Sequence, residues 1–64
     1  MNKRAKAKAG VIELLQIHNA GGDAKKEYAA IANHSFVDVA AAIGELVQEV
    51  PNERDRRFLE ALEI

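Results

Sequence analysis

The residues between Ser35 and Pro51 constrain the fold most, because they have the pattern of one complete amphipathic helix. Apolar side chains recur there with helical spacing and form one stripe: Phe36, Val39, Ala40, Ile43, Leu46, Val47 and Val50. Ser35 is a favourable N-cap, and Pro51 disfavours helix at the residue before it. We therefore predict a helix over residues 36–50 whose apolar stripe faces the core.

Two shorter helical patterns precede this segment. The first predicted helix begins at Gly10 and ends at residues 19–22, where two glycines supply the left-handed conformation that is common at helix C-termini. Asp23 caps a second helix over residues 24–32. Asn33 is expected to close that helix in the left-handed conformation.

A last helix is predicted after Asn52, which serves as its N-cap. Its inner face consists of Phe58, Leu59 and Leu62. No segment alternates polar and apolar residues with a period of two, so strands are not expected. The sequence therefore predicts an all-α protein, a compact bundle of three to four short helices.

The basic residues at the start of the chain predict its domain organisation. Lys3, Arg4, Lys6 and Lys8 alternate with alanines, and positive side chains oppose the positive end of a helix dipole. We therefore predict a flexible basic arm over residues 1–9, or a first helical turn that projects beyond the body, and a single helical domain over residues 10–64. A chain of 64 residues buries only a small core, and small helical proteins often gain stability by oligomerising. A homodimer is the expected state.

Composition and motif content exclude several classes of protein. There is no cysteine, which excludes disulfides and thiolate metal sites, and the formal net charge of −1 disfavours a general polyanion binder. No signal peptide or membrane span fits, so we expect a cytoplasmic protein without a membrane partner. His18 and His34 have no further histidine or cysteine at ligand spacing. We predict no metal, no cofactor, no catalytic residue and no small-molecule substrate.

A second, shallower face of the residue 36–50 helix predicts an interaction surface. Val37, Ala41 and Gly44 share this face, and Gln48 continues it by one turn. Glycine inside a helix costs about 1 kcal/mol relative to alanine, which close packing of another helix would offset. That helix belongs either to this chain, as its first or last helix, or to another chain. We expect a small protein-interaction module that acts as a regulator or inhibitor by binding another protein.

The spacing of Lys25, Ala29, Asn33 and Val39 resembles that of the helix-turn-helix family over about a third of the chain. This resemblance implies a DNA-binding regulator with a helix-turn-helix in its middle. The phosphate contacts would come from six basic residues: Lys3, Arg4, Lys6, Lys8, Lys25 and Lys26. No lysine or arginine lies between Glu27 and Glu53, however, so the second helix offers few groups that read base edges. Nucleic-acid binding is therefore the disfavoured alternative.

Overall fold

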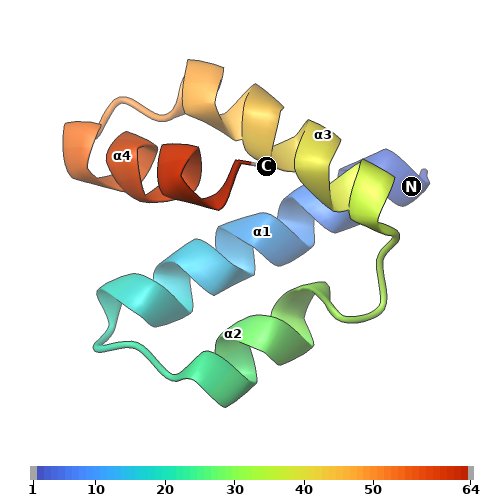
Figure 1. The fold of residues 1–64 in the computed structure, drawn as a ribbon, viewed down its shortest axis with the longest axis horizontal. Helices are drawn as coiled ribbons and strands as arrows, with labels where there is room; N and C mark the ends of the chain where they lie inside the picture. The colour runs from blue at the N-terminus through green and yellow to red at the C-terminus, as the bar shows by residue number, and fades with distance from the viewer. Residues whose placement is uncertain (1, 64) are drawn as a thin grey trace.

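Four α-helices make up the secondary structure of residues 2–63, the part of the chain that the computed structural model describes (Figure 1). They are α1 (Lys3–Asn19), α2 (Ala24–Ile31), α3 (Phe36–Glu49) and α4 (Glu53–Leu62). No strand occurs among these residues, and their radius of gyration is 10.7 Å. The predicted all-α bundle is confirmed.

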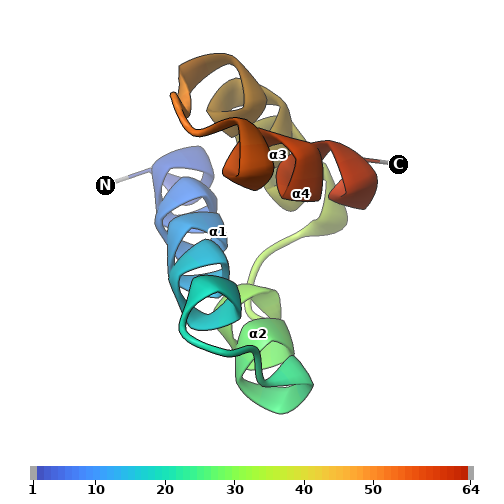
Figure 2. The same cartoon turned by 90° about the vertical axis from the view of Figure 1, so that its left-hand side faces the viewer.

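The helices form two hairpins, and α1 is the central element of the molecule. α1 packs against α2 on one side and against α3 on the other, while α4 folds back along α3 (Figures 1 and 2). The directions of α2 and α3 differ by 106°. The two hairpins are therefore joined by a sharp turn over residues 32–35.

The core is built by three of the four helices. The buried cluster contains Ala7, Val11 and Leu15 from α1, Ala42, Ile43 and Leu46 from α3, and Leu59 from α4. Val11 and Leu59 are completely buried. α2 has no buried residue and only packs Ile31 against this cluster. The stability of the bundle therefore depends mainly on the contacts among α1, α3 and α4.

Local sequence signals set three of the helix starts as predicted. The Asp23 carboxylate accepts hydrogen bonds from two backbone amides of α2, at 3.1 and 3.2 Å. The Ser35 hydroxyl accepts one from the amide of Asp38 at 3.2 Å, and the Asn52 side chain accepts one from Asp55 at 3.1 Å. Each cap satisfies amides that have no partner within their own helix.

The predicted start of the first helix at Gly10 is wrong, because α1 already begins at Lys3. Asn2 is its N-cap, with a side-chain oxygen 2.7 Å from the amide nitrogen of Ala5. Ala7 is completely buried, so this part of α1 also packs against the core. Cap and packing together outweigh the unfavourable charge. The flexibility expected of residues 1–9 stays a prediction.

Two further expectations need correction. Asn33 does not take the left-handed conformation, since no residue other than glycine has a positive φ among the described residues. The α2–α3 turn instead includes a hydrogen bond from the amide of His34 to the carbonyl of Ile31, at 3.2 Å. The closure of α1 is as predicted, because Gly21 and Gly22 have φ angles of 122° and 80°.

The buried face of α3 is rotated relative to the predicted stripe. Ala42 is completely buried, whereas Ala40 and Phe36, both predicted to be inside, are exposed. Phe36 is the first residue of α3 and is 63% exposed. The face of α3 that is buried is the one that contacts α1, and Ala42 belongs to the same cluster as Ala7 of α1. The rotation leaves an apolar edge of α3 at the surface.

No single helix among the described residues has both the length and the apolar character needed to cross a membrane. Only the bent pair of α2 and α3 meets the length and composition test when taken together.

Candidate interaction surface on α3

The outer face of α3 carries the four residues predicted for a protein interface. Val37 is 67% exposed, Gln48 is exposed, and Ala41 and Gly44 are half-buried. A β-carbon added at Gly44 would meet no heavy atom within 4 Å. Within residues 2–63, no other helix of this chain therefore packs closely at Gly44. This excludes the explanation that the glycine serves contact with the first or last helix of its own chain.

An apolar pocket of about 350 Å³ lies beside this face. Val11 and Leu14 of α1 line it, together with Ile31 of α2 and Leu62 of α4. α3 contributes five residues to its wall: Phe36, Val39, Ala40, Ile43 and Gly44. Glu63 is the only charged residue of the lining. The pocket and the outer face share Gly44, so they form one continuous surface.

This pocket is not predictable from helical periodicity, because its lining residues come from all four helices and their arrangement is set by tertiary packing. Helical periodicity places Val11, Leu62 and Phe36 on apolar faces, but it does not reveal where those faces stop touching one another. The gap exists because α2 packs on α1 whereas α4 packs on α3, which leaves α2 and α4 apart. No local sequence signal encodes that distance.

The other edge of α3 is acidic and lies next to α1. Glu49 forms an ion pair with Lys8, with Oε2 and Nζ 2.7 Å apart, and Glu45 is exposed nearby. The hydrogen bond that Lys8 donates to Glu49 raises the pKa of Lys8 above 10.5, desolvation opposes this shift, and the charges of Glu49 and Glu45 add to the increase. The ammonium group of Lys8 is therefore already paired within the chain.

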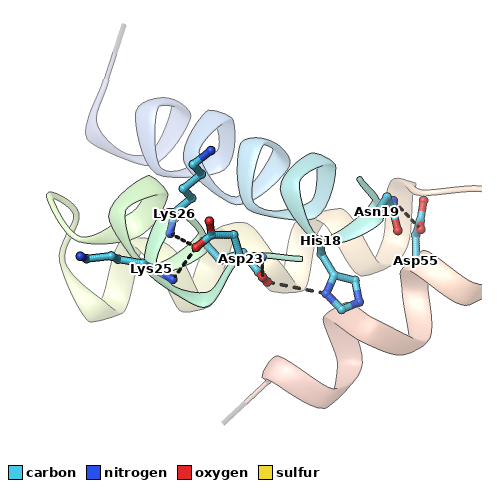
Figure 3. A network of polar contacts seen from close by, with 7 residues as sticks. His18, Asn19, Asp23, Lys25, Lys26 and Asp55 are labelled. Carbon is cyan, nitrogen blue, oxygen red and sulfur yellow. Dashed lines mark hydrogen bonds and ion pairs between the residues drawn. The ribbon is translucent and has the colours of Figure 1, made fainter. Parts of the chain in front are cut away.

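The six basic residues predicted for nucleic-acid contacts do not form one patch. Lys3 and Lys6 line a depression together with Ser35 and Asp38, beside the start of α3. Lys25 and Lys26 belong to the first turn of α2, and their ammonium groups point away from Asp23 (Figure 3). α1 separates these two groups by most of its length, about 25 Å for 17 residues. Arg4 is exposed near the start of α1.

Both histidines have partners within the fold. The ring of His18 stacks on Phe58 with centroids 3.8 Å apart and planes at 11°. Nδ1 of His18 lies 3.6 Å from the Glu27 carboxylate, the contact marked by the dashed line at His18 in Figure 3. Asn19 beside it donates a hydrogen bond to Asp55 at 3.1 Å. His34 lies against Gly10. The contacts of His18 and Asn19 join the end of α1 to α2 and α4.

Fold and surface together define residues 2–63 as a small all-α bundle with an exposed apolar face on α3. The chain matches no family model, no curated protein and no solved structure.

Proposed function

We propose that this protein is a non-enzymatic interaction module that regulates or inhibits another protein by binding it through α3. The observation that carries the proposal is the exposed apolar surface on and beside α3. Phe36 and Val37 are 63% and 67% exposed, and the 350 Å³ apolar pocket lies next to them. The proposal includes self-association through the same helix and the cytoplasmic location expected from the sequence.

Two features of the α3 surface support the binding of a partner there. Apolar residues scattered singly over a protein surface need no explanation, but a continuous apolar patch beside a pocket is typical of a binding site. Gly44 adds a second argument, because glycine destabilises the middle of a helix by about 1 kcal/mol, and a β-carbon there would meet no heavy atom of residues 2–63 within 4 Å. Close approach of a partner helix would offset that loss.

The test is the substitution Gly44→Leu. The added side chain extends into open space, so the monomer should fold as before, with an unchanged helical circular-dichroism signal. The bulky side chain should prevent close approach of a partner helix and abolish binding. A pull-down from the native host, with mass-spectrometric identification of bound proteins, compares the two chains.

The matched control is Ala29→Leu, which adds the same side chain at an exposed position of α2 away from this surface. Ala29→Leu should retain the proteins that the unmodified chain captures, and Gly44→Leu should lose them. Identical capture by all three chains would contradict the proposed role of α3.

A helix-turn-helix regulator is the second candidate, and one observation favours it. α2 and α3 differ in direction by 106° and are joined by residues 32–35, which fits the angle and the short turn of that motif. The surface of α3 opposes this candidate, because Asp38 and Glu45 would approach phosphates. DNA contacts would have to come from the basic residues of α1 and α2.

A gel-shift assay at low and at moderate salt tests this candidate. Phosphate contacts predict a shift that weakens steeply with salt and is reduced by Lys3→Ala/Lys6→Ala. The absence of a shift at low salt would exclude DNA binding by this route.

A further inference from the structure

We propose that a second copy of this chain occupies the surface on α3, with the two α3 helices antiparallel across a two-fold axis between Ala41 and Gly44. This inference rests on the proposed function, because it uses the same surface. The exposed apolar residues Phe36 and Val37 and the mouth of the pocket then become part of the interface between the two copies.

The order of residues along α3 suits a two-fold contact. In such a contact the same surface of both copies is in contact with itself. For antiparallel helices, the spacing of the contact residues must therefore be the same in either direction along the helix. Val37, Ala41, Gly44 and Gln48 are separated by four, three and four positions, a spacing that is identical in both directions. Val37 of one copy then lies against Gln48 of the partner subunit, and Ala41 lies against Gly44 of the partner subunit. The smallest residues meet at the centre, where two helices approach most closely.

Charges beside α3 complement each other in the same arrangement. Lys3 and Lys6 lie near Asp38 at the start of α3, whereas Glu45 lies two turns further along on the same edge. Among residues 2–63, none of Lys3, Lys6 and Glu45 forms an ion pair. In an antiparallel dimer, Glu45 of the partner subunit lies near Lys3 and Lys6 of the first copy. By symmetry, Glu45 of the first copy lies near the same two lysines of the second copy. Such pairs fix orientation more than they add affinity.

The size of the molecule requires contacts beyond the ridge of α3. A stable interface buries roughly 800 Å² on each partner. That is close to a fifth of the 4472 Å² surface of this chain. One ridge of a helix of 14 residues provides only part of this area. Phe36 and the pocket mouth on one edge, and the lysine contacts on the other, supply further area.

Disulfide trapping tests the antiparallel register, because the chain contains no cysteine of its own. Val37→Cys and Gln48→Cys both change exposed residues of α3 and should leave the fold intact. Under mild oxidation, a mixture of the two variants should form a covalent heterodimer, while each variant alone should remain mostly uncrosslinked. Rapid crosslinking of Val37→Cys with itself would indicate parallel helices and overturn the inference.

Charge reversal tests the lysine contacts. Lys3→Glu/Lys6→Glu places acidic residues at both contacts of a homodimer, and Glu45→Lys places basic residues at both. Each variant alone should therefore be monomeric by light scattering at a concentration where the unmodified chain has twice its 7.0 kDa mass. An equimolar mixture restores both attractive contacts and should recover the doubled mass. A mixture that stays monomeric, or variants that dimerise as well as the unmodified chain, would overturn the proposed charge pairing.

Failure of this inference is distinguishable from failure of the proposed function. An unmodified chain that stays monomeric at millimolar concentration, yet loses its captured host protein on Gly44→Leu, would refute self-docking and leave α3 as the binding helix. A chain that dimerises in the predicted register, yet captures the same proteins with and without Gly44→Leu, would refute only the binding of another protein through α3.

Discussion

A β-carbon added at Gly10 would lie 2.6 Å from the carbonyl oxygen of Ala30 and 3.2 Å from Nε2 of His34. α1 and α2 therefore approach so closely that only glycine fits at this position. At Gly44 the same addition meets open space. Two glycines inside helices thus have different physical roles: one permits packing within the chain, and the other leaves an outer helix face flat.

This difference predicts opposite effects of the same substitution. Gly10→Ala should destabilise the protein by about 1–3 kcal/mol, because the neighbouring backbone must move. Gly44→Ala should stabilise the monomer by up to about 1 kcal/mol, because alanine has the higher helix propensity. Urea denaturation of dilute protein measures both. Equal destabilisation by the two substitutions would contradict the open space at Gly44.

The Lys8–Glu49 ion pair predicts how stability changes at high pH. The pKa of Lys8 is raised above 10.5 in the folded state, chiefly by the hydrogen bond that Lys8 donates to Glu49. Folding therefore gains stability from this pair below pH 10.5, and the gain disappears as the pH rises through the folded-state pKa. The difference in urea midpoint between the unmodified chain and Lys8→Gln should shrink above pH 10.5. A difference that is constant with pH would show that the pair contributes no stability.

At the scale of the helices, some features are determined by local sequence and others by tertiary contacts. Asp23, Ser35 and Asn52 cap their helices as predicted, because a cap needs only residues within one turn. The start of α1 at Lys3 is not predictable from local signals, because the burial of Ala7 depends on Ala42 of α3, which lies more than thirty residues away. The exposure of Phe36 depends in the same way on where α1 crosses α3. Periodicity predicts an apolar face, but the crossing point decides which part of that face is covered.

The early start of α1 predicts that residues 1–9 are structural. Deleting them removes the Asn2 cap, the buried Ala7 and the Lys8–Glu49 pair. The melting temperature should fall by more than about 5 °C, since 1 kcal/mol corresponds to roughly 4–8 °C in a domain of this size. Asn2→Ala, which removes the cap alone, should cost about 1 kcal/mol and serves as the control. An unchanged melting temperature after the deletion would instead support the flexible arm.

At the scale of the whole molecule, the size of the core limits stability. Seven residues form the buried cluster, three of them alanine or valine, and α2 adds no buried residue. A core this small leaves little reserve against conformational entropy, so burying the α3 surface in a dimer would raise stability appreciably. Stability and association should therefore be coupled.

This coupling predicts that the melting temperature rises with protein concentration. A tenfold increase in chain concentration stabilises a dimer by about 1.4 kcal/mol, which corresponds to several degrees for a protein of this size. Val37→Glu places a charge on the exposed apolar face of α3 without touching the core, so the melting temperature of this variant should not vary with concentration. Differential scanning calorimetry over a hundredfold range of concentration compares the two chains. Superimposable curves for the unmodified chain at all concentrations would show that it unfolds from a monomer. They would also show that α3 does not bind a second copy under these conditions.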